Sequence, residues 1–258
     1  MERGPRFEHL LGTCRTLVGQ LESSDKTPLL TLMLEGPVGS GKSALAAKLA
    51  LESTFPFVKM VSPDAFVGQS ENYKCQKLTK TFEDAYMSPL SVIVLDVIER
   101  LQEYESIGPR FSNVILQTLL VLIKRLPPEG HKLLVIGTTS LPSVMESMEI
   151  TSAFNVVQNV PLLNPEDVGI VFKALNVFSE EDLQVQSLKY SDRMCTFGMA
   201  RKLIFVDTDV LGCVMLLSVY TQGAVNVLDN EVPIKRLMLM VEMARMGNSK
   251  TVTLERFI

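Results

Sequence analysis

The apolar positions of this chain fall into short continuous runs that alternate with segments of helical spacing. Apolar residues at spacings of three and four, or runs rich in Ala and Leu, predict helices over Lys42–Glu52, Glu71–Tyr86 and Phe111–Leu126. The continuous runs predict strands over Leu29–Glu35, Phe57–Val61, Ser91–Asp96, Lys132–Thr138 and Phe154–Val160. Runs that are apolar throughout are typical of strands buried on both faces. We therefore expect an α/β fold with a five-stranded parallel sheet sandwiched by helices. The pattern leaves the order of the strands open.

The pattern changes after Pro161. Asn164 followed by Pro165 is typical of a helix start, and the region up to Lys189 has helical character. Val232–Met246 is again an amphipathic helix, whereas the segment from about 194 to 231 matches no helical period. We predict an α/β core over residues 1–162 and a small helical subdomain over residues 163–258, interrupted by that irregular segment.

Composition and charge narrow the class of protein. The chain has 258 residues, of which 47% are hydrophobic and 21% charged, and its net charge of −4 gives no basic footprint for nucleic acid. Four cysteines without a CxxC pair and two histidines argue against a zinc site or a disulfide framework. The longest apolar stretch, Val210–Tyr220, is about half the length that crosses a bilayer. We therefore expect a cytoplasmic protein without a transmembrane segment or a nucleic-acid partner.

The segment from Gly36 to Ser43 carries the clearest chemical signal. It fits the pattern G-x-x-x-x-G-K-[ST] between a predicted strand and a predicted helix, which is the context of a phosphate-binding P-loop. Glycines there let backbone N–H groups turn toward phosphate oxygens, and the helix adds the positive end of its dipole. Lys42 is expected to contact the β- and γ-phosphates of ATP, and Ser43 to ligate Mg²⁺. The predicted nucleotide-binding residues of this loop are Gly36, Pro37, Val38, Gly39, Ser40, Gly41, Lys42 and Ser43.

Asp96 closes the apolar run Val92–Asp96, which has the Walker B form. A buried parallel strand delivers its last carboxylate to the edge of the sheet where ligands of α/β folds bind. We expect Asp96 to hold the Mg²⁺ together with Ser43. The alternative is an ordinary aspartate after a strand, and the P-loop upstream disfavours it.

Two features that support hydrolysis are missing. A site that hydrolyses ATP needs a residue that orients or activates water, normally a carboxylate directly after the Walker B aspartate. That position is Val97, and Glu99, two residues further on, is expected to face elsewhere. Ring ATPases also use an arginine finger after the fourth strand, but no Lys, Arg or His lies between Lys132 and Lys173. We identify no arginine finger, and interpret Arg110 as a solvated or interface arginine.

The sequence resembles the AAA+ ring ATPases, and among them the second ATPase domain (D2) of the vesicle-fusing ATPases. The similarity runs from about Arg15 to about Ala174 and resumes at Ile234–Met240. The strings that carry it are Met33–Ala50, Phe55–Phe57, Ser62–Asp64, Asp96–Leu101, Ile107–Asn113 and Ile136–Ser140.

The resemblance implies a homo-hexamer that binds ATP and Mg²⁺ tightly, hydrolyses ATP weakly and supports disassembly of SNARE complexes through an adaptor protein. It implies that Thr139 is at the sensor-1 position, beside Asp96 in the catalytic set, and that Lys235 is a sensor-2 lysine that contacts the phosphates. The adaptor and the SNARE complex would be reached through N-terminal domains that this chain lacks, and those partners would bring it to membranes.

Departures from the family pattern keep other interpretations open. Val97 replaces an acidic residue and Pro233 a glycine, and the segment 194–231 has no counterpart in the family. The main alternative is a non-catalytic, ATP-dependent assembly module or an inactive truncated isoform, in which bound ATP stabilises the fold without being consumed. A P-loop small-molecule kinase would need an acceptor-binding subdomain and an arginine-bearing lid between the core strands, and the sequence has neither.

Overall fold

The computed structural model describes residues 4–24, 26–105, 110–164, 167, 170, 171, 174 and 233–245. The chain divides into two compact units, one formed by His9–Pro161 and the other by Met1–Glu8 with Leu162–Ile258. The predicted irregular segment 194–231 and the apolar stretch Val210–Tyr220 lie outside the described residues. The helices and strands are α1 (Pro5–Ser23), β1 (Leu29–Glu35), α2 (Lys42–Glu52), β2 (Phe57–Val61), η1 (Pro63–Phe66), α3 (Glu71–Tyr86), β3 (Leu90–Leu95), α4 (Ile98–Leu101), α5 (Asn113–Lys124), β4 (Lys132–Thr139), α6 (Pro142–Ser147), η2 (Thr151–Ala153), β5 (Val156–Asn159) and α10 (Ile234–Arg245).

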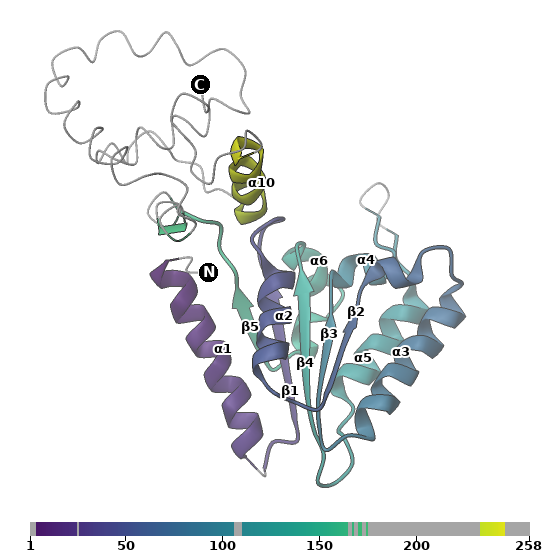
Figure 1. The fold of residues 1–258 in the computed structure, drawn as a ribbon. Coiled ribbons are helices and arrows are strands. Elements are labelled where there is room, and N and C mark those ends of the chain that lie inside the picture. The colour runs from purple at the N-terminus through teal and green to yellow at the C-terminus, as the bar shows by residue number, and fades with distance from the viewer. Residues whose placement is uncertain are drawn as a thin grey trace, which may run out of the picture. The chain divides into compact units, whose positions relative to one another are not determined.

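The unit His9–Pro161 is built on a five-stranded parallel sheet, as predicted, with the strand order β2-β3-β4-β1-β5 (Figure 1). The strand β1 pairs with β4 on one side and with β5 on the other, so that Leu32 lies opposite Ile136 and Val156. Because these strands pair in parallel, the carboxyl ends of β1, β3 and β4 lie at the same edge of the sheet. That edge is where α/β sheets bind ligands.

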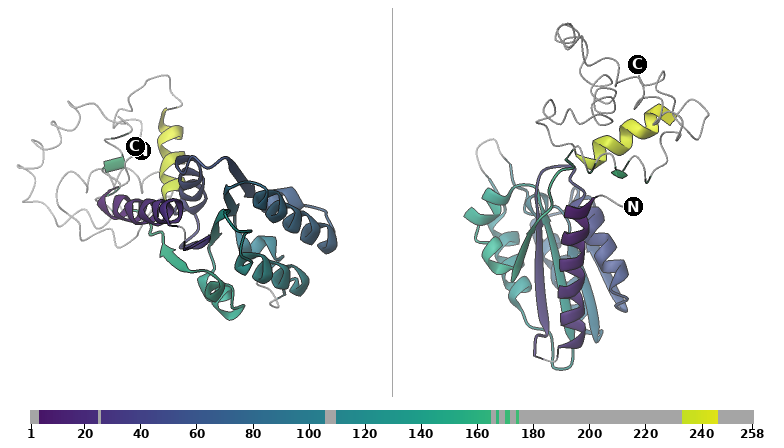
Figure 2. Two further views of the ribbon diagram at one scale, coloured as in Figure 1. Left: turned by 90° about the horizontal axis from the view of Figure 1, so that it is seen from below. Right: turned by 90° about the vertical axis from the view of Figure 1, so that its left-hand side faces the viewer.

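Helices cover both faces of the sheet, as the uniformly apolar strands predict. On one face α3, α5 and α6 pack against residues such as Met33, Ile93 and Val135, which form one continuous cluster of buried side chains. The opposite face buries Leu32, Val94 and other alternate positions of the same strands. There α2 packs on the sheet, and α1 runs along the β1–β5 side of the unit (Figures 1 and 2).

The long helix α1 was missed by the sequence analysis. Its signal was present, because the residues that it buries recur at helical spacing. Those residues are Phe7, Leu10, Leu11, Cys14, Val18 and Leu21. Arg15 on the outer side of α1 forms an ion pair with Glu52 of α2, with Nη2 2.9 Å from Oε1. The shared apolar face and this pair fix α1 beside α2.

Helix α5 and strand β5 each begin two residues later than predicted, whereas β3 and β4 differ from their predicted bounds by one residue. Helix α5 begins at Asn113 and not at Phe111, because the hydroxyl of Ser112 accepts the N–H of Ile115 and caps the helix. Strand β5 begins at Val156 and not at Phe154. Phe154 instead fills the core, and Asn155 hydrogen bonds to the backbone N–H and hydroxyl of Thr31 through its side chain. The backbone N–H of Asn155 also donates to the carbonyl oxygen of Thr31 at 3.1 Å, so side-chain and backbone bonds together join this residue to β1.

In the second unit, part of the predicted helix start after Pro161 is described. The side chain of Asn164 accepts the N–H of Asp167 at 2.7 Å, which is the bond expected of a capping residue. The carboxylate of Asp167 in turn pairs with Arg6 at 3.0 Å. Helix α10 starts two residues after the predicted Val232 and covers Ile234–Arg245. Most of the expected helical region up to Lys189 lies outside the described residues.

Candidate functional site

The loop between β1 and α2 has the backbone that its glycines predict. Gly36, Gly39 and Gly41 have positive φ angles of 147°, 82° and 91°. Gly36 also lies so close to the passing backbone that an added Cβ would be 2.4 Å from the carbonyl oxygen of Val160. Glycine is therefore required at this position for both conformation and space.

The start of α2 is left open as an anion site. Gly41 is the residue that precedes the helix and has no side chain to cap it. The first N–H groups of a helix have no partner within the helix, so those at the start of this eleven-residue helix face the loop. The hydroxyl of Ser40 is buried there without a hydrogen-bond partner. In the loop Pro37 and Val38 are exposed, and the other residues are buried or half-buried. These donors suit a phosphate group.

Lys42 lies inside the loop and not in solvent. Its side chain is 6% exposed, and its Nζ donates to the carbonyl oxygens of Gly36 at 2.8 Å and Pro37 at 2.7 Å. Burial lowers the pKa of Lys42, while the negative charges of Glu99 and, less strongly, Asp96 raise it. The ammonium group is thus held at the mouth of the loop with two carboxylates nearby, ready to exchange carbonyl oxygens for phosphate oxygens.

Ser43 and Asp96 are brought together as predicted. The hydroxyl of Ser43 donates to Oδ1 of Asp96 at 2.6 Å, and the hydroxyl of Thr138 donates to the same oxygen at 2.8 Å. Asp96 is 9% exposed, so this cluster lies just beneath the surface of the ligand edge. A hydroxyl and a carboxylate oxygen are the ligands that Mg²⁺ prefers, and the residues therefore fit this ion. When bound, the ion would neutralise phosphate charge.

Thr138 is a residue of this cluster that the sequence analysis missed. Its hydroxyl donates to Asp96 and accepts the backbone N–H of Val97 at 2.8 Å, so it fixes the end of β3 to β4. Thr139, the predicted sensor-1 residue, is buried at the end of β4, and its hydroxyl accepts the N–H of Leu141 at 3.1 Å. The signal for Thr138 was the parallel pairing of β3 with β4, which no local pattern reveals.

Val97 follows Asp96 in a left-handed conformation, with φ 52° and ψ 64°. This conformation is costly for a β-branched residue, because its Cβ substituents crowd the backbone. The isopropyl group has no proton acceptor. Position 97 therefore gives the site neither a base nor an oxygen ligand, as the sequence predicts.

Glu99 does not face elsewhere, and that expectation was wrong. Its side chain is 6% exposed, and Oε1 accepts the backbone N–H of Ser140, directly after β4, at 2.9 Å. Its charge also acts on Lys42 more strongly than that of Asp96 does. The reason is the left-handed turn at Val97, which starts α4 at once and turns the second residue of that helix back toward the end of β4.

Arg110 and Lys235 are the two remaining residues that the sequence analysis considered for the site. Arg110 is exposed and makes an isolated antiparallel bridge with Glu105, as expected for an arginine at the surface. Lys235 is exposed on α10, which belongs to the other compact unit. Its role as a sensor-2 lysine stays a prediction.

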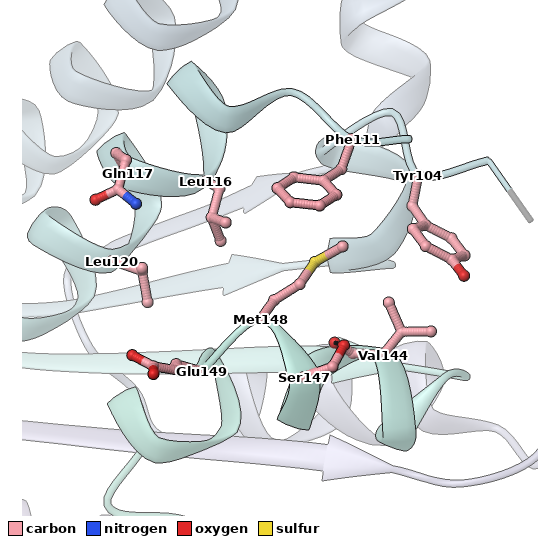
Figure 3. Close-up of a pocket in the computed structure, with 9 residues that line it drawn as sticks. All are labelled: Tyr104, Phe111, Leu116, Gln117, Leu120, Val144, Ser147, Met148 and Glu149. Atoms are coloured by element: carbon pink, nitrogen blue, oxygen red, sulfur yellow. Dashed lines mark hydrogen bonds between the residues drawn. The ribbon is translucent and has the colours of Figure 1, made fainter. Parts of the chain in front are cut away.

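A separate pocket of about 440 Å³ opens between α5, α6 and the chain after α4. Figure 3 shows Phe111, Leu116 and Met148 directed toward its interior. Its lining is mostly apolar and shares no residue with the loop Gly36–Ser43 or with Asp96. Over the described ranges there is no group of three or more His, Cys, Asp or Glu side chains that could hold a metal ion. No helix in the part of the chain that the structure describes is both long and apolar enough to cross a membrane.

Comparison with known proteins places the chain in a family. Residues 32–162, about half of the chain, match the model of the AAA family, described as ATPases associated with various cellular activities. The vesicle-fusing ATPase of Arabidopsis thaliana is 53% identical over 180 residues, which cover 70% of this chain and 24% of that protein. The vesicle-fusing ATPase of Dictyostelium discoideum is 51% identical over 161 residues, 62% of this chain and 22% of that protein.

The vesicular-fusion protein sec18 of Schizosaccharomyces pombe is 38% identical over 221 residues, which cover 81% of this chain and 28% of that protein. The chain thus spans about a quarter of the length of these relatives. The strand order of the sheet, the phosphate-binding loop after β1 and the match to the AAA model all indicate the same family. The chain belongs to the AAA family of ATPases and is similar, over most of its own length, to the vesicle-fusing ATPases.

Proposed function

We propose that this chain binds ATP with Mg²⁺ through Gly36–Ser43 and Asp96, as a D2-type subunit of a vesicle-fusing ATPase. The observation that carries the proposal is the cluster in which Lys42 is held inside the loop and Ser43 contacts Asp96 at 2.6 Å. An ammonium group, a helix start without a cap and two oxygen ligands for a hard cation supply the contacts that a magnesium nucleotide needs.

The assembly role is a homo-hexamer that acts on SNARE complexes during vesicle fusion and intracellular protein transport. It is supported by the similarity to the proteins of Arabidopsis and Dictyostelium, which are named vesicle-fusing ATPases. Contact with the SNARE complex and its adaptor belongs to parts of such proteins that this chain does not cover. In this proposal the protein is cytoplasmic and reaches membranes through those partners.

The proposal includes three further assignments. Residues 163–258 form the small helical subdomain of the AAA+ fold and residues 1–162 its core. Lys235 on α10 contacts the phosphates as a sensor-2 residue, and Thr139 is the sensor-1 residue. Hydrolysis is slow, because Val97 has no carboxylate and no arginine occurs between Lys132 and Lys173.

A second candidate function is a purely structural role for ATP. Val97 favours it, since a site without a carboxylate at this position can bind ATP at a subunit interface without consuming it. Bound ligand then stabilises the assembled form by mass action. Phosphate release by the assembled chain separates the two candidates.

The first test is the mass of the purified chain in solution with and without ATP–Mg²⁺. We expect a hexamer that forms only with the nucleotide and that is lost in Lys42→Ala. The matched control is Lys48→Ala, which removes a half-exposed lysine of the same helix that only approaches Glu52 at 3.9 Å. A chain that stays monomeric at saturating ATP–Mg²⁺, or a Lys42→Ala variant that still assembles with the nucleotide, contradicts the proposal.

A further inference from the structure

The site contains a carboxylate that the Walker motifs do not account for. Glu99 lies on the single turn of α4, and its side chain is 6% exposed. Oε1 accepts the N–H of Ser140 at 2.9 Å, whereas Oε2 is buried and has no hydrogen-bond partner. A buried carboxylate oxygen without a donor is costly, because it has lost its hydration and gained nothing in exchange. Such an atom in a folded protein points to a donor that binds there.

The surroundings of Glu99 indicate which donor this is. Glu99 lies three residues after Asp96, whose Oδ1 accepts the hydroxyl of Ser43 at 2.6 Å. The N–H of Ser140 fixes it at the carboxyl edge of the sheet, directly after β4. Val97 stands where a water-activating carboxylate is expected, and its side chain cannot activate water.

We propose that Glu99 takes over this function: it orients and deprotonates the water that attacks the terminal phosphate. This inference rests on the proposed function, since it concerns the ATP bound by the same loop. In the reaction, one O–H bond of water breaks and its proton passes to Oε2 of Glu99. The water oxygen forms a bond to the terminal phosphorus, and the bond from that phosphorus to the bridging oxygen breaks with its electron pair left on ADP. Glu99 then returns the proton to phosphate or solvent.

The conformation of Val97 gives this role a structural basis. Because residue 97 is left-handed and donates its N–H to Thr138, α4 begins without a linker and Ile98 is driven fully into the core. Glu99 consequently projects toward Ser140 instead of toward solvent. The displaced carboxylate is held by two bonds between backbone and side chain that link β3, α4 and β4.

A purely structural Glu99 would only hold Ser140 in place, and one substitution separates the two roles. Glu99→Gln keeps an oxygen that accepts the N–H of Ser140 but cannot take up a proton from water. The experiment measures single-turnover phosphate release at saturating ATP–Mg²⁺, with ATP affinity and assembly measured on the same samples. The matched control is Glu83→Gln, an exposed carboxylate on α3.

We expect Glu99→Gln to release phosphate about a hundredfold more slowly, the scale of a lost general base, with unchanged ATP affinity and assembly. Equal release by Glu99→Gln and the wild type overturns the inference and leaves Glu99 a structural residue. Binding and assembly without any release by the wild type also overturn it, while the proposed function survives as the structural role of ATP. Absence of ATP binding by the wild type overturns both.

The thermal unfolding temperature without ligand shows whether Glu99→Gln is folded. If that temperature falls, Glu99→Asp is the second variant, because it keeps the charge and withdraws the carboxylate by one methylene group. Slower release with retained affinity supports the inference in this variant too, and unchanged release contradicts it.

Discussion

The hydroxyl of Ser43 lies 2.6 Å from Oδ1 of Asp96, so the first turn of α2 is tied to the end of β3 across 53 residues of sequence. Two oxygen ligands for a hard cation are therefore adjacent before any ligand arrives. A Mg²⁺ ion held by these two oxygens would replace the proton contact between them, and the backbone that carries both is already in place. This contact makes the metal dependence of nucleotide binding the most direct property to measure.

Ser43→Ala removes one of the two oxygen ligands and leaves the loop backbone intact. We expect ATP to bind this variant about tenfold more weakly when Mg²⁺ is present, equal to about 1.4 kcal/mol, and with unchanged affinity when EDTA removes the metal. Titration with a fluorescent ATP analogue under both conditions measures the ratio of the affinity with Mg²⁺ to the affinity without it. Ser147→Ala, an exposed serine of α6, is the control and should leave the ratio unchanged. An equal loss with and without Mg²⁺ would assign Ser43 to the phosphates.

Thr138→Val keeps the shape of the side chain and removes its hydroxyl. The change leaves the N–H of Val97 without its acceptor and Oδ1 of Asp96 with one donor fewer. We expect the free energy of unfolding in urea to fall by about 1–3 kcal/mol, because buried polar groups lose a partner. Thr138→Ser keeps the hydroxyl, and its free energy of unfolding should fall much less. Equal losses in the two variants would mean that the methyl group matters and the hydrogen bonds do not.

The left-handed conformation of Val97 can be tested with two substitutions that remove the same branched side chain. Asn tolerates this conformation much better than Ala, so Val97→Asn should be more stable than Val97→Ala by about 1 kcal/mol. Urea denaturation of both variants measures the difference. If the alanine variant is the more stable one, residue 97 is not left-handed in solution.

Much of this architecture can be predicted from local sequence, but some residues of the site depend on contacts between segments that are far apart in the sequence. Strand β1 and helices α2 and α3 have the predicted bounds, because apolar periodicity and the glycine loop are local signals. The glycine-rich conformation of the loop and the closeness of Ser43 to Asp96 could also be predicted from sequence. Thr138 was missed, since its contact depends on β3 pairing with β4, and a pattern read along one segment contains no pairing partner.

Glu99 was assigned the wrong direction for a related reason. An ordinary turn after Asp96 would point residue 99 away from the sheet edge, but Val97 adopts a conformation that β-branched residues rarely take. Sequence rules assign such a residue to extended backbone, so they misplace the residues that come after it. The wrong direction expected for Glu99 therefore has the same cause as the unexpected conformation of Val97.

The ion pair between Arg15 and Glu52 predicts a pH dependence. The hydrogen bond from Arg15 lowers the pKa of Glu52 below its ordinary value of 4.5, and the charges of Arg15 and Lys48 act in the same direction. A depressed folded-state pKa stabilises the fold above pH 4.5, and this contribution is lost as the pH falls below that value. Arg15→Gln should raise the pKa of Glu52 toward 4.5 and flatten the dependence of stability on pH in that range. NMR titration of the Glu52 carboxyl checks the shift, and an unchanged pKa contradicts it.

The pairing of β1 has a consequence for how the protein is made. Leu29 aligns with Leu133, and Leu32 with Val156, so the strand that ends in the phosphate loop finds both neighbours only after β2 and β3 have been synthesised. On the ribosome β1 must therefore wait unpaired while most of the sheet is still being translated, and distant pairings of this kind form slowly. A chain released early would carry the complete loop sequence on a strand with no partner, an aggregation-prone edge in place of a nucleotide site.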